Sequence, residues 1–232
     1  IRREVSYGNA VHCGEMILER LVARHVCIGE IQDTLSQGVI PVVTSSYEEL
    51  LDQLHPDVVV DAILAKKNVG TTRLDAPFVI GVGPGFSAGR DVNVVIETMR
   101  GHNLGRCIYD GEAEPNTGIP GNVGGYTHER VIHSPKAGVF TAKRHIGDEV
   151  QANEVIGYVD EEPVRAKITG TLRGILKTGL IVSDHFKLAD VDARCEESHC
   201  YSISDKSLAV GGGVLEAVTA WDYERNKDGK HL

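Results

Sequence analysis

Residues 77–126 have the sequence PFVIGVGPGFSAGRDVNVVIETMRGHNLGRCIYDGEAEPNTGIPGNVGGY and hold 11 of the chain's 26 glycines. The apolar run at 78–80 leads into four closely spaced glycines at 81, 83, 85 and 89. Apolar residues then recur at helical spacing over 92–99, so the stretch predicts a strand, a glycine-rich turn and a helix. Backbone N–H groups in such a turn, with the positive end of a helix behind them, favour a bound anion such as phosphate.

Candidate ligand-binding residues cluster in and around this stretch. Three cationic or titratable side chains follow the expected helix within seven residues, close enough to converge on one oxyanion. A long loop at 110–126, rich in glycine, proline and asparagine, is expected to close over the ligand. We predict no catalytic residue and no metal ligand. The predicted cofactor-binding residues are Gly83, Gly85, Phe86, Ser87, Lys66, Arg100, His102, Arg106, Asn116 and Thr117.

Simpler interpretations of the same residues stay open. Glycines also turn a chain tightly between a strand and a helix, with no ligand involved. Lys66 and Lys67 follow a predicted strand, where they could face the same crevice as the glycine turn or form an ordinary surface pair. The long loop could equally be a linker between domains.

Composition limits the class of protein. The net charge is −9 and the pI is near 5.6, which argues against nucleic acid or an anionic membrane as a general partner. No apolar segment approaches ~20 residues, so we expect a soluble, cytoplasmic protein. The five cysteines are scattered, which favours reduced thiols over a disulfide framework.

The first half of the chain alternates between strand and helix patterns. Buried strands are expected at 39–43, 57–63 and 78–80, with a helix from 47 that Ser46 and Glu49 cap. Shorter elements are expected before them, including strands at 5–7 and 21–23 and a helix at 28–35. This rhythm predicts a Rossmann-like α/β domain over 1–126, with a mostly parallel sheet whose N-terminal part is incomplete. Ligands of such sheets bind beyond the carboxyl ends of the strands.

An internal repeat fills residues 131–192. Gly138, Gly147, Val150 and Val159 recur as Gly170, Gly179, Val182 and Val191, all at an offset of 32. Neither copy can bury its apolar face alone, so we expect the two to interlock. The pattern resembles the biotinyl/lipoyl barrel-sandwich hybrid, which we assign to 127–195. In carriers of that fold a lysine on the hairpin between the halves receives the cofactor. The equivalent hairpin at 159–165 has no lysine at its tip, so we expect no covalent biotin or lipoate.

The remaining segment, 196–232, is expected to form a C-terminal helix and tail. Ser204 or Asp205 caps the predicted helix, and three glycines at 211–213 lie within it. Glycine costs about 1 kcal/mol relative to alanine in a helix interior. Close packing or a nearby ligand would explain that cost, and a broken helix is the alternative.

Several long motifs occur together in one order along the chain. They are Ile1-Arg2-Arg3, VDAILAKKN at 60–68, the glycine turn at 81–89, ETMRGHNLGR at 97–106, NTGIP at 116–120, Val191-Asp192 with Arg194, and ISDK at 203–206. This sequence resembles the YqeB-type accessory proteins of selenium-dependent molybdenum hydroxylases, which are related in role to the XdhC/CoxI maturation factors. The resemblance implies a cytoplasmic protein that helps mature or insert a molybdenum cofactor. Members of that family usually begin with a strand, a Gly-Ala-Gly-Asp-type turn and a helix, and this sequence starts after that segment.

Three classes of function follow. The favoured class is an accessory protein that binds molybdenum cofactor or a nucleotide and passes it to the apo-hydroxylase, with homo-oligomerisation left open. The second is an enzyme for nucleotide, sulfur or selenium chemistry, with Glu97 or His102 as base and Cys107 as nucleophile. The third is a scaffold that binds the hydroxylase and no small ligand. Whether the chain is an enzyme stays open, and the accessory role is preferred.

Overall fold

The computed structural model describes residues 5–228, which form a mixed α/β protein with parallel and antiparallel sheets and a C-terminal helix. The chain divides into two compact units, each made of two segments. The first unit joins Ile1–Thr44 to Ile119–Ile203, and the second joins Ser45–Gly118 to Ser204–Leu232. This grouping differs from the segmentation into 1–126, 127–195 and 196–232, because packing within each unit joins segments that are distant in sequence. The α/β class with a C-terminal helix is as predicted.

The second unit is built on a four-stranded sheet in the order β4-β5-β7-β8. Its first three strands are parallel and β8 is antiparallel. The helix α3 (Tyr47–Leu54) precedes the sheet, and its N-cap Ser46 accepts a hydrogen bond from the Glu49 N–H, as predicted. A small hairpin pairs β6 with β9. The strand bounds are β4 Val58–Asp61, β5 Phe78–Val82, β6 Ser87–Ala88, β7 Val94–Ile96, β8 Cys107–Ile108 and β9 Gly111–Glu112.

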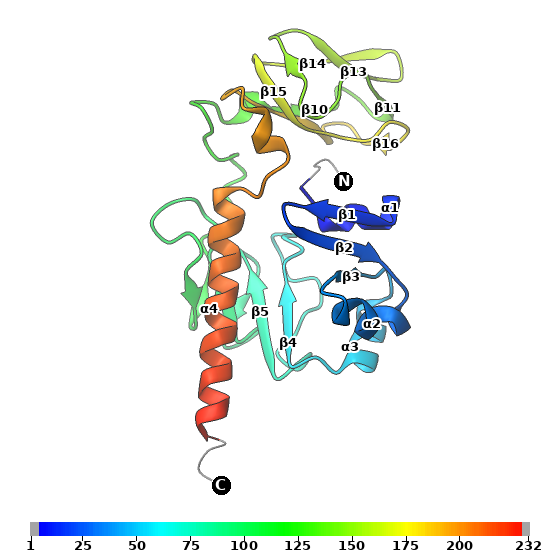
Figure 1. Ribbon diagram of the computed structural model, residues 1–232. Helices are drawn as coiled ribbons and strands as arrows, with labels where there is room; N and C mark the ends of the chain where they lie inside the picture. Colours follow the sequence, from blue (N-terminus) through cyan, green and yellow to red (C-terminus); the bar gives the residue numbers. More distant parts are fainter. Residues whose placement is uncertain (1–4, 229–232) are drawn as a thin grey trace. The chain divides into compact units, whose positions relative to one another are not determined.

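The helix α4 (Asp205–Asp228) covers one face of this sheet (Figure 1). Trp221, towards its C-terminal end, stacks on Phe78 at the start of β5 with ring centroids 5.2 Å apart. Gly213, nearer its N-terminal end, packs against Ile96 at the end of β7. The helix therefore runs opposite to the parallel strands, so that its N-terminus lies at their carboxyl ends. Ser204 caps it by accepting a hydrogen bond from the Ser207 N–H.

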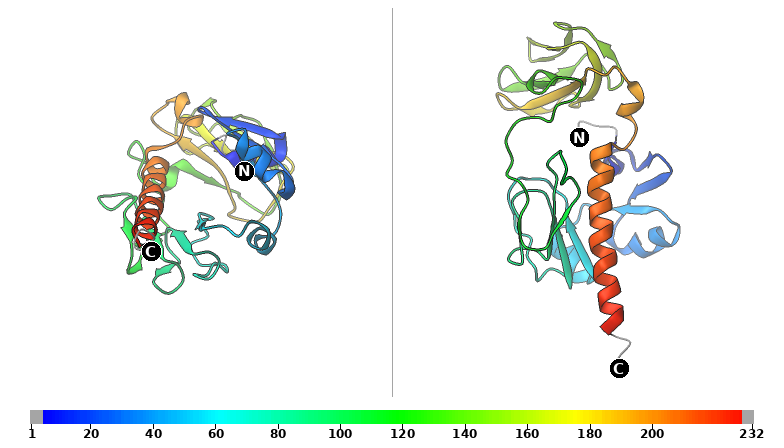
Figure 2. Two further views of the ribbon diagram at one scale, coloured as in Figure 1. Left: turned by 60° about the horizontal axis from the view of Figure 1, so that its bottom comes forward. Right: turned by 90° about the vertical axis from the view of Figure 1, so that its left-hand side faces the viewer.

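The three glycines at 211–213 do not break α4, which is continuous along its length (Figure 2). A Cβ at Gly213 would collide with the carbonyl oxygen of Gly105. Close packing of the helix on the sheet therefore explains this glycine, as one of the two interpretations predicts. Nothing lies within 4 Å of a Cβ built at Gly211 or Gly212.

The helix predicted over 92–99 was wrong. The chain forms β7 there, and the glycine-rich turn connects β5 to a short strand and then to β7. Residues Val94, Val95 and Ile96 are all fully buried, because both faces of this central strand are covered. Three adjacent β-branched residues favour a strand, and the apparent helical spacing over eight residues reflected burial on both faces. No helix dipole therefore stands directly behind the glycine turn.

The N-terminal segment of the first unit forms a three-stranded sheet in the order β1-β2-β3, in which β2 and β3 are parallel. The predicted strand at 21–23 and helix at 28–35 are confirmed. The predicted strand at 5–7 is wrong, because a 3-10 turn begins at Tyr7. The bounds are η1 Tyr7–Asn9, α1 Ala10–Cys13, β1 Glu15–Leu18, β2 Leu21–His25, η2 Ile28–Glu30, α2 Ile31–Ser36 and β3 Ile40–Val42.

The second segment of this unit contains two four-stranded sheets, β10-β17-β15-β12 and β14-β13-β11-β16. The two copies of the repeat exchange strands: Gly138 pairs with Val182, and the equivalent Gly170 pairs with Val150. The copies therefore interlock, as the repeat predicts. The bounds are η3 His128–Arg130, β10 Val131–His133, β11 Gly138–Ala142, β12 Glu149–Val150, β13 Val155–Val159, β14 Glu162–Arg165, β15 Gly170–Ile175, β16 Ile181–Val182, β17 Lys187–Asp192 and η4 Glu197–Cys200.

Candidate functional site

The carboxyl ends of β4, β5 and β7 meet at one edge of the second unit's sheet. Three loops leave from this edge, at 62–77, 83–86 and 97–106. The N-terminus of α4 lies at the same edge, because the helix runs opposite to these strands (Figure 1). Ligands of parallel sheets usually bind at this edge, so it is the expected place for a binding site.

Three cationic side chains from separate segments gather at this edge. Lys66 follows β4, Arg100 follows β7, and Lys206 stands in the first turn of α4. Partial burial, and then the charges of Lys66 and Arg100, lower the pKa of Lys206, while the negative charge of Glu97 opposes them. Sequence analysis predicted Lys66 and Arg100. Lys206 was not among the predicted site residues, although it belongs to the ISDK motif at 203–206 and lies at the start of a predicted helix, more than 100 residues further along the chain.

Arg100 has a carboxylate partner within the unit. Its two terminal nitrogens donate to the two carboxylate oxygens of Asp205, at 2.7 and 2.9 Å. By contrast, no hydrogen bond or ion pair joins the ammonium group of Lys66 or of Lys206 to any of residues 5–228. These two lysines therefore keep their positive charge available to a ligand.

A pocket of 460 Å³ opens beside Lys66. Three of the predicted site residues, Lys66, Gly85 and Asn116, line it. Gly85 has a positive φ of 111°, and a Cβ there would stand 2.5 Å from the Cα of Lys67. Only glycine fits this close contact. The full lining is Lys66, Pro84, Gly85, Glu112, Ala113, Glu114, Pro115 and Asn116.

A buried carboxylate holds one wall of the pocket in place. Glu97 is 2% exposed, and its carboxylate oxygens accept hydrogen bonds from the backbone N–H groups of Met99 at 2.6 Å and Glu114 at 2.8 Å. The second bond ties the 113–116 wall to the loop that follows β7. A buried carboxylate held in this way positions both loops.

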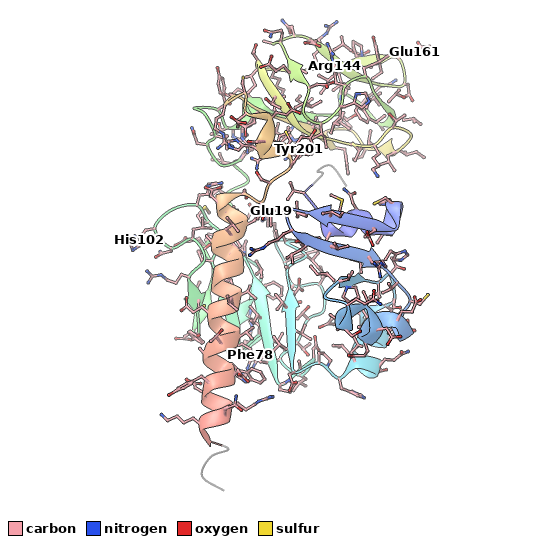
Figure 3. All side chains as sticks on the ribbon, in the orientation of Figure 1. Glu19, Phe78, His102, Arg144, Glu161 and Tyr201 are labelled. Atoms are coloured by element: carbon pink, nitrogen blue, oxygen red, sulfur yellow. The ribbon has the colours of Figure 1, made fainter. Side chains whose placement is uncertain are left out.

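The other predicted site residues do not line the pocket. Phe86 is buried beneath Gly81, and the Gly83 N–H donates to the Ile96 carbonyl, so it is committed to the sheet. The Ser87 N–H donates to Asp91. His102 is exposed on its loop (Figure 3). Arg106 and Thr117 are exposed outside the pocket lining. The Gly83 N–H is therefore not available to bind an anion, because it is hydrogen-bonded within the sheet. The cations at this edge come from segments that are more distant in the sequence.

The alternative nucleophile, Cys107, is placed as a structural thiol. Its Sγ donates to the Gly213 carbonyl oxygen at 3.2 Å, under α4. Burial, with the negative charge of Glu216, raises the pKa of this thiol. A nucleophilic cysteine requires the opposite shift. Within residues 5–228, no group of three or more histidine, cysteine, aspartate or glutamate side chains could hold a metal ion. No helix in the same range is long and apolar enough to cross a bilayer.

No protein-family model matches the chain. It is 47% identical over 219 residues to a protein of Escherichia coli (strain K12) named "Uncharacterized protein YqeB". The alignment covers 94% of this chain and 40% of that protein, so the chain spans less than half the length of the curated relative it matches. The YqeB-type resemblance is therefore supported. The relative's name carries no activity, ligand or partner, and the molybdenum hydroxylase role stays a prediction.

Two solved structures show weak similarity. An aspartoacylase family protein from Mesorhizobium loti is 21% identical, with a TM-score of 0.26 over 28% of this chain and 23% of that chain. The ectoine utilization protein EutE (DoeB) from Ruegeria pomeroyi is 12% identical, with a TM-score of 0.25 over 70% of this chain and 61% of that chain. Scores this low assign neither a fold nor a function.

Proposed function

We propose that this chain is part of an accessory protein that helps mature a selenium-dependent molybdenum hydroxylase. Its task would be to hold a phosphate-bearing ligand at the carboxyl edge of the β4-β5-β7 sheet and to pass it to the apo-hydroxylase. The maturation role rests on the YqeB-type resemblance. The Rossmann-like and barrel-sandwich assignments belong to the same proposal, and the parallel order of the sheet and the strand exchange between the two repeats support them.

The observation that carries ligand binding is that Lys66 and Lys206, from separate segments, lie at the same edge of the sheet, and that neither ammonium group has an ion pair within residues 5–228. Like charges repel, so placing two lysines without carboxylate partners at one edge costs free energy that a bound anion would offset. A phosphate group would offset that repulsion by accepting hydrogen bonds from both lysines. Molybdenum cofactor and nucleotides both carry such a group.

Catalysis has less support than binding. Both oxygens of Glu97 are held by backbone N–H groups, and the Cys107 thiol donates to a carbonyl under α4. His102 stands on an exposed loop, outside the pocket lining. These side chains therefore do not form a base and nucleophile pair in the arrangement described above. A scaffold that binds only the hydroxylase gives Lys66 and Lys206 no ligand to bind.

Calorimetric titration with CTP, GTP, ATP, NAD(P) and molybdenum cofactor tests the proposal. We expect saturable binding of at least one of them, weakened about tenfold or more in Lys66→Met/Lys206→Met because two charge-assisted bonds are lost. Lys177→Met, an exposed lysine of the first unit, is the matched control and should bind like the unaltered chain. If none of these ligands binds, or if both variants bind equally well, the site is not at this edge.

A further inference from the structure

The pocket beside Lys66 carries charges of both signs, and this limits the ligands that fit it. Lys66, which follows β4, lines the pocket together with Glu112 and Glu114 of the loop that contains β9. Glu112 has a distant partner, with an oxygen 3.8 Å from a terminal nitrogen of Arg90. The Glu114 carboxylate makes no hydrogen bond or ion pair with the residues from 5 to 228. Lys66 and Glu114 line one pocket without pairing with each other.

The backbone is fixed at two residues that line this pocket. Lys66 has a φ of 65°, a left-handed conformation that side chains other than glycine and asparagine rarely adopt. Strain of this kind is typical of sites where a side chain must point in one direction. The buried Glu97 holds the Glu114 N–H at 2.8 Å. The backbone is therefore held in place at both Lys66 and Glu114, and these two residues bring an ammonium group and a carboxylate to the lining of one pocket.

A purely anionic ligand does not match this arrangement, because Glu112 and Glu114 would repel it. A matching ligand carries an anionic group for the lysines and a second edge that donates hydrogen bonds to a carboxylate. The volume of 460 Å³ is suited to a ring system of one or two fused rings. Two adjacent N–H donors on one edge would match the two oxygens of a single carboxylate.

We propose that this pocket binds a ligand with a 2-amino-4-oxopyrimidine edge, the donor edge shared by guanine and pterin, and that Glu114 recognises that edge. The anionic group of the ligand would lie between Lys66 and Lys206. The ring N–H and the exocyclic amino group would donate to the Glu114 carboxylate, and Asn116 lines the same wall. This inference deepens the proposed function and rests on its anion site.

The test compares GMP with IMP, which differs only in lacking the 2-amino group, by calorimetric titration of the whole chain. We expect GMP to bind about tenfold more tightly than IMP, because IMP leaves one carboxylate oxygen without its donor. In Glu114→Gln the ratio should fall to about one. Lys66→Met should weaken both nucleotides by a similar factor and keep the ratio. Glu216→Gln, on the exposed face of α4, is the matched control and should change neither affinity.

Pterin-6-carboxylate distinguishes the two sources of the edge. Binding of this pterin, weakened in Glu114→Gln, with no binding of GMP, would support the pocket as a pterin site. Equal affinity for GMP and IMP in the unaltered chain, with no effect of Glu114→Gln, would overturn recognition of the edge while the anion site stands. If no anionic ligand binds at all, the proposed function fails, and this inference fails with it. Circular dichroism checks folding, and the exposed Glu114 side chain has no structural partner to lose.

Discussion

Cationic side chains gather in both units, but their surroundings differ. In the first unit, Arg173 and Arg194 both contact Asp192, which is 1% exposed, at 3.5 and 2.6 Å. In the second unit, burial and then the positive charge of Lys66 lower the pKa of Lys206, and neither ammonium group has an ion pair within the described part of the chain. The first arrangement is electrically satisfied by the fold itself. The charges of Lys66 and Lys206 have no such carboxylate partner among residues 5–228. The difference distinguishes cations that stabilise the fold from cations that are available to bind a ligand.

The pKa shifts follow the same contrast. Burial alone would raise the pKa of Asp192, but hydrogen bonds from Arg194 and the charge of Arg173 lower it to about 2. The shift shows that the charged form of Asp192 is stabilised in the fold. Burial and two like charges lower the pKa of Lys206, so its charged form is disfavoured. The charged form of Asp192 therefore stabilises the first unit, and the charged form of Lys206 destabilises the second.

The largest expected effect comes from breaking the satisfied cluster. Asp192→Asn removes the buried carboxylate that Arg173 and Arg194 both contact, so we expect the unfolding free energy to fall by about 3–5 kcal/mol. Urea denaturation followed by circular dichroism measures it. Asp160→Asn is the matched control, because Asp160 occupies the equivalent position of the other repeat and its side chain is 44% exposed. Equal losses in the two variants would contradict the assigned role of the buried cluster.

A smaller effect is expected where α4 meets the sheet. Gly213→Ala places a Cβ against the Gly105 carbonyl oxygen, so the helix must shift, at a cost of about 1–3 kcal/mol. The shift would also move Lys206 relative to Lys66 and weaken anion binding. Gly211→Ala meets open space and should instead stabilise the helix by up to about 1 kcal/mol. Thermal denaturation of the two variants checks the difference in sign.

Sequence patterns predicted the parts of the molecule that depend on local order. The β4 and β5 strands, the Ser46 cap and the interlocking repeat each follow from patterns within a few residues or from a fixed offset. The expected helix at 92–99 failed because burial on both faces of a strand leaves no period of two to detect. One face of this strand is buried by α4, which lies more than 100 residues further along the chain, so the short sequence window around the strand does not show the cause of the burial.

The candidate site was predictable in part for the same reason. Lys66 and Gly85 were found because they lie at a strand end and in the glycine turn, and Asn116 because it belongs to the long loop expected to close over the ligand. Lys206 and Glu114 were not, because long-range packing brings them there. His102 and Arg106 were chosen for their proximity in sequence, yet the loop after β7 leaves both exposed and outside the pocket lining. Closeness along the chain was a poor guide to convergence in space.

The smallest expected effect comes from removing the charge of Lys206. Lys206→Met removes a disfavoured charge beside Lys66 and Arg100, so the unliganded chain should become more stable by less than about 1 kcal/mol at pH 7, since solvent screens a half-buried ammonium. In the unaltered chain the folded pKa of Lys206 lies below the unfolded value of 10.5, so the unfolded state binds more protons between the two values. Stability should therefore rise with pH through that window, and the variant should lack this rise.

Urea denaturation at pH 7 and again near pH 10.5 measures both effects, with Lys177→Met as the matched lysine in the first unit. A loss of stability in Lys206→Met at pH 7 would mean that Lys206 is paired, like the arginines around Asp192. In that case the contrast between the two clusters would disappear, and with it the main reason to expect an anion at the edge of the β4-β5-β7 sheet. A gain in stability, together with weaker anion binding in the same variant, would show that the charge of Lys206 lowers the stability of the fold and raises its affinity for an anion.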